Sequence, residues 1–454
     1  MRSFTRVLIS LTLAAAIQSA EVVFADSKSL EDRLVDLEQQ VGILKRQLEL
    51  KKEDEDKAKK ETPVISASSK DGFSIKSSDD SFKLKIRGLV QADGRFFTDN
   101  QKDNGTTDTF SVRRARPIAE GTVGKNFDFY LMPDFGGGAA TLVDAYGEFK
   151  LSPALKLRTG KFKAPLGLER LQSDAVSNFT EIGLPSNLLA NREVGLQLSG
   201  DVLGETVNYA VGVFNGTADL ASSTGQDTDN NSDKDVVGRI FAQPFKNNGP
   251  QSLKGLGVGI AGSFGHKEGS TTPTYKSTGQ ANIFSYTSTN ADGPHIRITP
   301  QTYFYKGSLG LLGEYAVSKQ KVNRVSNGTI IRDTFSNKGW QVSGNYVLTG
   351  ELASYKGITP RTNFDLSQGT WGALEAVGRY GHLDIDDAIF DNGFSSLNTS
   401  VSEADAWGVG LNWYPHKNYR VSLDFEQTRF TGGSPAGADR QTENVILSRF
   451  QVSY

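Results

Sequence analysis

The chain has 454 residues, a formal net charge of -2 and no cysteine. The absence of cysteine excludes a disulfide framework and any thiolate metal site, and four scattered histidines form no metal-binding pattern. A nearly neutral balance gives no bulk attraction to nucleic acid. We therefore expect neither a cofactor nor a nucleic-acid partner.

The N-terminal segment has the composition of an export signal. Arg2 and Arg6 precede an apolar run over residues 7–17, and small residues follow, with Ala20 and Ala25 as candidate cleavage positions. We expect a signal peptide over residues 1–25, cleaved after Ala25; the alternative is an uncleaved anchor helix. Beyond it, the sequence contains no run of about 18 apolar residues, so no transmembrane helix is predicted there.

Residues 26–61 are predicted to form a periplasmic helix. Aliphatic residues recur at intervals of four and three in this segment, namely Leu30, Leu34, Leu37, Val41, Leu44 and Leu48. This spacing is the seam of a coiled coil of about three heptads. Such a coil is marginal alone, so we expect it to join copies that another part of the chain holds together. The alternative is an amphipathic helix lying on its own domain. A linker is expected over residues 62–72, where Pro63 and several serines follow the charged end of the helix.

From residue 73 to residue 454, segments of about ten residues alternate apolar and polar side chains between Gly, Asn, Asp, Ser and Pro. We count sixteen, beginning near residues 82, 109, 126, 141, 155, 192, 206, 235, 255, 295, 308, 338, 370, 403, 418 and 444. A mean hydropathy of -0.38 fits strands with one wet face and one apolar face. The fold class predicted is therefore all-β, a sixteen-stranded antiparallel transmembrane β-barrel carrying a short N-terminal coiled-coil helix.

The connections and the last strand support this interpretation. Short turns mostly alternate with longer polar segments near 98–108, 164–190, 215–234, 265–294, 319–337, 386–402 and 431–442, although 136–140 is short and 350–369 is long. This asymmetry is typical of outer-membrane barrels, which have short periplasmic turns and long outer loops. The terminal Tyr454 shares a face with Val452 and Phe450, as in the assembly signal of such barrels.

The predicted lumen is charged with both signs, and its basic residues concentrate on the first, second and fifth strands. Charges that line a pore set its selectivity, but they can equally pair with inward acids and stiffen the wall. The segment 164–190 is unusually apolar for an outer loop. We expect it to fold into the barrel and bring Glu169, Arg170, Ser173 and Asp174 to a constriction; the alternative is packing at a subunit interface.

The chain resembles the phosphate-selective porins O and P in patches over residues 73–454. The resemblance is carried by Leu-Val-Gln-Ala-Asp at 89–93, Val-Arg-Arg-Ala at 112–115, Gly-Lys-Phe at 160–162, Leu-Gly-Leu-Glu at 166–169, Tyr-Val-Leu-Thr-Gly-Glu at 346–351, Trp-Gly-Ala-Leu-Glu at 371–375 with Arg-Tyr at 379–380, and Gly-Leu-Asn-Trp-Tyr at 410–414. It implies a trimeric barrel of sixteen strands with a constriction loop, in which arginines and a lysine guide phosphate or similar anions.

Residues carry over from that family only in part. Arg113 and Arg114 match its paired arginines, Asp144 its constriction aspartate, Ser173 its loop serines, and Arg170 stands in place of its key lysine. Leu89 replaces an inward arginine. No arginine follows in 171–191, and the outer arginine cluster is missing from 265–294. These losses remove much of the anion funnel that the resemblance implies.

The function expected is passive diffusion of small solutes through an outer-membrane porin of a Gram-negative bacterium, with a preference for anions such as phosphate. The selective residues would be Arg113, Arg114, Arg116, Asp144 and Arg170, with Ser173 beside them. The expected partners are outer-membrane lipid, small anions and two further copies of the chain. The alternative is a general or cation-preferring porin that also tethers the envelope, with the coiled coil contacting the cell wall. An enzyme is not expected, because no nucleophile motif accompanies His266, His295, His382 or His416.

Overall fold

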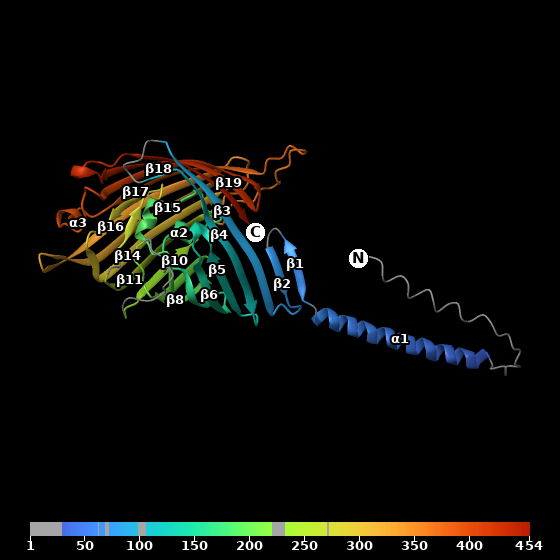
Figure 1. Ribbon diagram of the computed structural model, residues 1–454. Helices are drawn as coiled ribbons and strands as arrows, with labels where there is room; N and C mark the ends of the chain where they lie inside the picture. Colours follow the sequence, from blue (N-terminus) through green and yellow to red (C-terminus); the bar gives the residue numbers. More distant parts are fainter. Residues whose placement is uncertain (1–29, 62, 69–71, 99–105, 220–231, 270–271) are drawn as a thin grey trace. The chain divides into compact units, whose positions relative to one another are not determined.

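The computed structural model describes residues 30–61, 63–68, 72–98, 106–219, 232–269 and 272–454 (Figure 1). The predicted signal peptide, residues 1–25, lies outside these described residues. The chain divides into two compact units, Met1–Thr62 and Pro63–Tyr454, and each is treated by itself.

The first unit contains one long helix, α1 (Leu30–Glu61). The predicted helical segment is therefore present. Five aliphatic residues of the heptad seam are exposed by 47–66%: Leu34, Leu37, Val41, Leu44 and Leu48. None of the helices in the described residues combines the length and the apolar character needed to cross a membrane.

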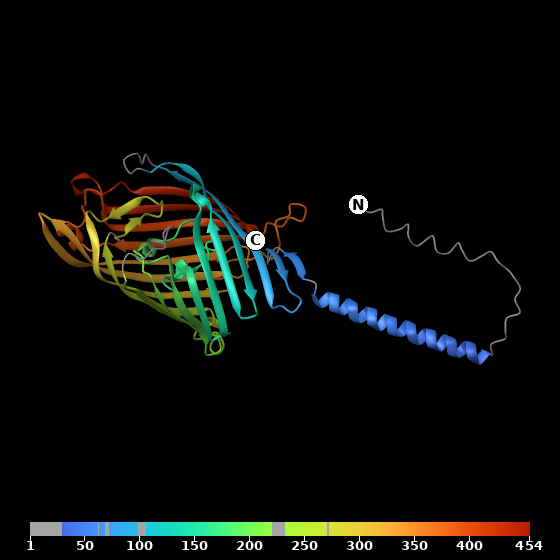
Figure 2. The same ribbon diagram turned by 60° about the horizontal axis from the view of Figure 1, so that its bottom comes forward.

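The second unit is a closed antiparallel β-barrel (Figure 2). Its strands in the described part of the chain are β3 (Phe82–Phe97), β4 (Thr109–Val123), β5 (Phe127–Asp134), β6 (Thr141–Ser152), β7 (Leu155–Lys163), β8 (Arg192–Val202), β9 (Val207–Phe214), β10 (Asp235–Ala242), β11 (Leu256–Gly269), β14 (Thr289–Lys306), β15 (Leu309–Ser326), β16 (Thr329–Val347), β17 (Ala373–Asp384), β18 (Val401–His416), β19 (Tyr419–Gly432) and β20 (Glu443–Ser453). Each pairs with the next along the chain, and β20 pairs with β3 to close the barrel. The predicted sixteen-stranded fold is confirmed for these described residues.

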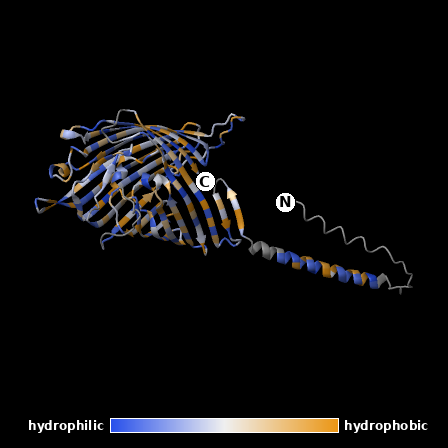
Figure 3. Cartoon of the chain, viewed as in Figure 1, coloured by the Kyte–Doolittle hydropathy of each residue, from blue (hydrophilic) through white to orange (hydrophobic). Residues whose placement is uncertain are grey.

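Hydrophobic and hydrophilic residues alternate along the barrel strands (Figure 3). On β19, Val421 and Leu423 are exposed outward, whereas Arg420, Ser422 and Asp424 are buried inside. Outward apolar side chains would face lipid, and inward polar side chains can hydrogen-bond within the lumen. Where the two-residue alternation is unbroken, the sequence pattern therefore indicates which residues face the lumen.

Two further strands extend the wall at one end. Strands β1 (Val64–Ser68) and β2 (Gly72–Lys76) form a hairpin, and β2 pairs with the first residues of β3, from Lys83 to Ile86. Strand β20 occupies the same edge of β3 from Leu89 onward. Strand β1 thus lies within the segment 62–72 that the sequence suggested as a linker.

The connections differ from the prediction at one clear point. A long loop was expected near 319–337, but β15 and β16 continue through this region and are joined by Asn327 and Gly328 alone. Both residues have positive φ, 50° and 76°. Asn-Gly is the preferred pair for a two-residue hairpin turn, so this dipeptide was the signal that the prediction overlooked. The region 265–294 also contains a small hairpin, β12 (Thr274–Lys276) and β13 (Asn282–Ser285).

Candidate functional site

The connection between β7 and β8, residues 164–191, folds into the lumen and is called the inner loop below. Its apolar side chains are buried, including Leu166, Leu168, Phe179 and Leu188, each at most 2% exposed. The loop turns inward at Gly167, whose φ is 73° and where an added Cβ would stand 2.5 Å from a methyl group of Leu189. Glycine alone fits both constraints. The inward folding predicted from the apolar character of this segment is confirmed.

One side of the lumen holds the inner loop with acids that accept hydrogen bonds from loop amides. Glu314 of β15 accepts from the backbone N–H of Leu168 (2.7 Å), and Asp424 of β19 accepts from the N–H of Thr180 (2.8 Å). Beside them, Arg379 of β17 donates to both carboxylate oxygens of Glu426, at 2.7 Å each. We call Glu314, Asp424 and Glu426 the acidic wall.

Donors on the neighbouring strands bind carbonyl oxygens of the same loop. Arg379 donates to Glu181 O (2.8 Å), Asn412 to Asn178 O (2.8 Å), Arg420 to Ser177 O (2.7 Å), Gln451 to Ala175 O (2.9 Å) and Gln91 to Asp174 O (2.9 Å). These contacts run along the wall from β17 to β20 and on to β3. The loop backbone is therefore fixed along this side of the lumen.

The hairpin β12–β13 packs against the inner loop. Asn187 donates to Lys276 O (2.9 Å), and the N–H of Lys276 donates back to the Asn187 side chain (2.9 Å). Tyr275 and Phe284 join the same buried apolar cluster as Leu188. The inner loop is thus held by the wall and by a second loop.

The adjoining side of the lumen, which begins at β4, is basic, and a β-bulge increases its charge. Gln91 pairs with Arg114 and Ala92 pairs with Val112, so Arg113 is an extra residue without a partner in the ladder. Such a bulge interrupts the two-residue alternation. Arg113 and Arg114 therefore both face inward, although they are consecutive: Arg113 contacts Glu181 of the inner loop, and Arg114 donates to Gln91.

Two residues further along β4, Arg116 is fixed from behind by Asp134, the last residue of β5. The guanidinium Nε donates to one oxygen of Asp134 at 2.6 Å. The other oxygen of Asp134 accepts from the backbone N–H groups of Ala115 (3.0 Å) and Gly136 (2.9 Å). Asp134 thus orients Arg116 toward the inner loop.

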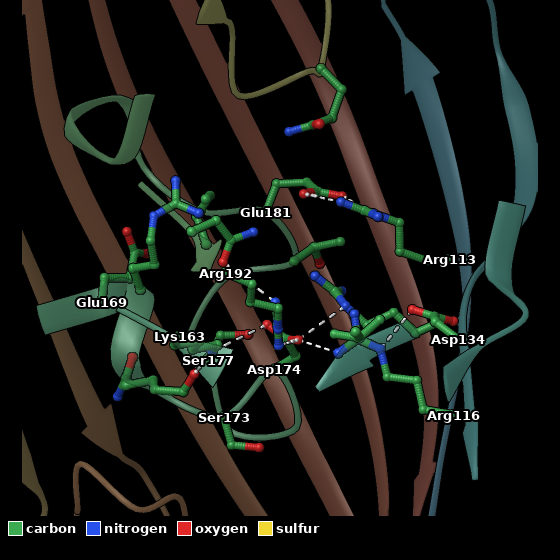
Figure 4. A pocket seen from close by; sticks show the side chains of 18 of the residues that line it. Arg113, Arg116, Asp134, Lys163, Glu169, Ser173, Asp174, Ser177, Glu181 and Arg192 are labelled. Atoms are coloured by element: carbon green, nitrogen blue, oxygen red, sulfur yellow. Dashed lines mark hydrogen bonds and ion pairs between the residues drawn. The ribbon is translucent and has the colours of Figure 1, made fainter. Parts of the chain in front are cut away.

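The carboxylate of Asp174 lies among four cations of the barrel wall, counted over the residues that the structure describes (Figure 4). Arg116 donates to it, Arg114 Nε lies at 3.5 Å, Arg192 at 3.7 Å and Lys163 Nζ at 4.0 Å. Burial would raise the pKa of Asp174, but these positive charges outweigh it and hold the pKa well below its usual value. We call Arg114, Arg116, Lys163 and Arg192 the cation cage, and these four with Arg113 the basic wall.

The cation cage marks the boundary between two cavities. One has a volume of about 340 Å³ and the other about 590 Å³. Both are lined by the same five described residues, Arg116, Lys163, Ser173, Asp174 and Arg192. The first cavity is lined by eight Lys or Arg side chains and four Asp or Glu side chains among the described residues, so cations predominate at this point of the lumen.

The predicted selective residues occupy different positions at this site. Arg113 is one-third exposed and bonded to Glu181 through two contacts of 2.7 and 3.2 Å. Asp144 accepts from Arg192 (3.0 Å) and lines only the larger cavity of the two. Arg170 lines the smaller cavity but is 5% exposed, and its guanidinium donates to Ser186 O within the loop. Ser173 is exposed between the two cavities.

The sequence does not single out several charged residues of this site, among them Lys163, Glu181 and Arg192. Lys163 and Arg192 are the last residue of β7 and the first of β8, where alternation gives no reliable direction. Glu181 lies in the loop, and its pKa is lowered to about 2, since Arg113 and other cations outweigh the effect of burial. One signal in the sequence points to Lys163 and Arg192: these two basic residues flank a loop that is expected to fold inward.

Many predicted lumen charges form ion pairs between neighbouring strands of the wall. Arg87 binds Glu120 (2.6 Å), Arg158 binds Glu148 (2.6 Å), Lys156 binds Asp201 (3.2 Å) and Arg449 binds Asp93 (2.6 Å). These charges stiffen the barrel and offer little net field. The cation cage differs, because four cations share one loop carboxylate there.

One buried constellation contains the residue types of a hydrolase triad. His295 Nε2 lies 2.8 Å from Ser318 Oγ and 3.3 Å from Asp219, and Ser318 donates to Asp219. A triad needs the acid on the second ring nitrogen, but Nδ1 of His295 has no partner within the described residues. His295 is 1% exposed, so a substrate cannot reach it. This cluster fixes loop 215–219 to the wall.

Comparison with solved structures shows that the fold is similar to that of outer-membrane channels. The fold matches the outer membrane channel DcaP of Acinetobacter baumannii with 13% identity and a TM-score of 0.53, covering 84% of this chain and 99% of that chain. It also matches OmpT of Vibrio cholerae in its trimer form (12% identity, TM-score 0.51, 83% and 100% covered) and an anion-selective porin from Comamonas acidovorans (12%, 0.50, 82% and 100%). The comparison with curated proteins gave no match. The family described as phosphate-selective porin O and P matches residues 82–454.

Proposed function

Since the chain belongs to the family of phosphate-selective porins O and P and is a porin of the outer membrane, we propose that it conducts small solutes passively with a preference for anions, phosphate among them. Solutes would diffuse down their gradients without a cofactor, an energy source or a chemical step. The cation cage, at the boundary of the two cavities, is the observation that carries this proposal.

The chemistry of the cage favours oxyanions. Arginine presents a planar fork of donors to phosphate or carboxylate, and lysine adds a point charge. An anion that passes from one cavity to the other would pass Arg116, Lys163 and Arg192, since these three cage residues line both. Field and hydrogen-bond donors at the narrowest point determine which ions pass.

We propose a broad anion preference and not strict phosphate selectivity. Leu89, where the family has an inward arginine, is 5% exposed and lines the larger cavity as an apolar group. Arg170 replaces the key lysine and is directed to Ser186 O inside the loop. The cage therefore keeps its positive charge. The positions of Leu89 and Arg170, which guide phosphate in the family, offer a permeating phosphate fewer donors in this chain.

The test is the reversal potential of the pore in a planar bilayer that separates two KCl concentrations. We expect a reversal potential on the anion side, and reduced chloride current when inorganic phosphate is added. A cation-side reversal potential that phosphate leaves unchanged would contradict the proposal. Conductance with no charge preference would support the alternative of a general porin.

We also propose that the protein is a homotrimer in outer-membrane lipid and that α1 lies in the periplasm and zips the three copies together. The seam of α1 supports this, because its five described aliphatic residues are about half exposed and have the spacing that partner helices cover in a coiled coil. OmpT of Vibrio cholerae has been solved in a trimer form.

A second candidate role of the same helix is attachment of the envelope to the cell wall. Deletion of residues 28–61 separates the roles. If α1 is a tether, cells that carry the deletion lose envelope attachment while single-channel conductance is retained. If α1 only zips the trimer, attachment is unchanged and the trimer dissociates at a lower temperature.

A further inference from the structure

The Asp174 carboxylate has the surroundings of a bound anion and not those of an ordinary ion pair. Four cations from three different strands converge on it, and it comes from a loop and not from the wall (Figure 4). Two of the cations have a second acid: Arg116 binds Asp134 at 2.6 Å and Arg192 binds Asp144 at 3.0 Å. These two would stay compensated if Asp174 moved away.

The other two cage cations have no second acid within ion-pair distance among the described residues. Arg114 donates to the neutral Gln91 (2.8 Å), and its Nε is buried without a hydrogen-bond partner in the described part of the chain. Lys163 donates to the carbonyl oxygen of Gln172 (2.5 Å). Arg114 and Lys163 would therefore carry two uncompensated positive charges once Asp174 left. This matches the charge of a hydrogen phosphate dianion near neutral pH.

We propose that Asp174 is a tethered counter-ion that occupies an oxyanion site of the pore, and that a permeating dianion binds in the cation cage by displacing it. The carboxylate mimics the oxygens of the permeant ion, and it compensates one of these two charges when no ion is present. The inference rests on the proposed function for its ligand, a small oxyanion.

The geometry permits this exchange. The Asp174 side chain is 17% exposed, and its neighbour Ser173 is exposed to both cavities. The backbone on either side is held by side chains other than the cage, since Gln91 binds Asp174 O and Gln451 binds Ala175 O. Rotation of one side chain can therefore open the cage without unfolding the loop.

Displacement makes Asp174 a specificity-determining residue. A monovalent ion such as chloride replaces the single negative charge of Asp174 with another single charge, so the exchange adds no attraction to the cage. A divalent oxyanion brings more charge and more hydrogen-bond acceptors. The cage would thus select for multivalent oxyanions because every ligand must compete with an attached carboxylate.

The experiment compares wild type with Asp174→Asn in planar bilayers, using inorganic phosphate as the probe. We expect phosphate to block chloride current in Asp174→Asn at a concentration about tenfold lower, which corresponds to roughly 1.4 kcal/mol. Asp201→Asn is the matched control, because it removes a lumen acid outside the cage. The Asp201 carboxylate pairs with Lys156 Nζ at 3.2 Å. Phosphate should block the chloride current of this control at the same concentration as in wild type.

A double variant shows whether the gain arises in the cage. Adding Arg114→Gln to Asp174→Asn should abolish the tighter block. An unchanged phosphate block in Asp174→Asn, or a gain that survives Arg114→Gln, would overturn the inference. The proposed function is decided separately by the wild-type reversal potential: a cation-side value would refute it, while the change produced by Asp174→Asn would still report on the cage.

Discussion

The two sides of the lumen hold the inner loop by opposite chemistry. On the acidic wall, carboxylates of β15 and β19 accept hydrogen bonds from loop amides, as Glu314 does from Leu168 and Asp424 does from Thr180. On the basic wall, arginines and a lysine of β4, β7 and β8 contact loop carboxylates, Asp174 and Glu181. Acids that bind amides are satisfied by the backbone, whereas cations that share carboxylates retain an excess of charge. The difference distinguishes a wall that anchors the loop from the wall that we propose selects anions.

The largest effect should come from breaking the anchoring side. Arg379→Ala would leave Glu426 buried without its partner, since the Arg379 side chain is 2% exposed and Glu426 is fully buried. Removing one member of a buried pair costs about 3–5 kcal/mol. We expect a clear drop in the midpoint of thermal unfolding in detergent. Arg332→Ala is the control: its pair with Asp292 is half exposed and should contribute no more than about 1 kcal/mol. Equal losses in the two variants would remove the distinction.

The next effect should come from the selecting side. Arg114→Gln removes one cation of the cage while Asp174 keeps three others among the described residues, so the loop should stay in place. We expect the anion-to-cation permeability ratio from reversal potentials to fall roughly three- to tenfold, or about 0.7–1.4 kcal/mol. Lys156→Gln, at a lumen pair away from the cage, should change it much less. If both variants lowered the ratio equally, the cage would be no different from the rest of the lumen.

A smaller effect of opposite sign should follow from Glu181→Gln. This change frees Arg113, whose side chain is 35% exposed. Exposed charges are screened by salt, so we expect the anion preference to rise only about twofold and the gain to shrink at high ionic strength. Reversal potentials at two salt concentrations would measure it. A fall in anion preference would mean that Glu181 matters through loop position and not through charge.

The smallest expected effect is that of pH. The pKa of Glu181 is about 2, and that of Asp174 is well below its usual value. Groups with lowered pKa values stay ionised, and their stabilising contribution is lost only as pH falls toward the folded pKa. These two carboxylates should therefore keep their charge from about pH 7 to about pH 4, and they should add no pH dependence to the selectivity there. A steep rise in anion preference between about pH 6 and pH 5 would show that these carboxylates titrate earlier and are not held by the basic wall.

The barrel could be predicted from the sequence because each strand repeats the same two-residue pattern. Val421 and Leu423 face one way and Ser422 and Asp424 the other, and such alternation needs no knowledge of neighbours. The inward folding of residues 164–190 followed from the cost of leaving apolar side chains such as Leu166 and Leu168 in water. The hairpin at Asn327 and Gly328 was missed because charged residues before and after it resembled a loop.

The site was harder to predict because pairing is a property of three-dimensional neighbours. Arg158 and Arg114 look alike in the sequence, yet Arg158 is paired with Glu148 in the wall and Arg114 stands beside a loop carboxylate. Arg170 was chosen by its place in a motif, and the structure directs it to Ser186 O. Alternation tells which side chains face inward but not which of them retain free charge.

The bulge at Arg113 adds one inward cation without adding a full two-residue repeat to the strand. In an unbroken strand, adding one lumen charge requires two residues and shifts everything beyond by a full repeat. At this position one inserted residue adds a guanidinium, and the ladder resumes with Ala92 opposite Val112. Deleting that residue would restore regular pairing between β3 and β4 and remove one positive charge from the lumen. The pairing of the other strands would be unchanged. The charge of this pore can thus be adjusted in steps of a single residue.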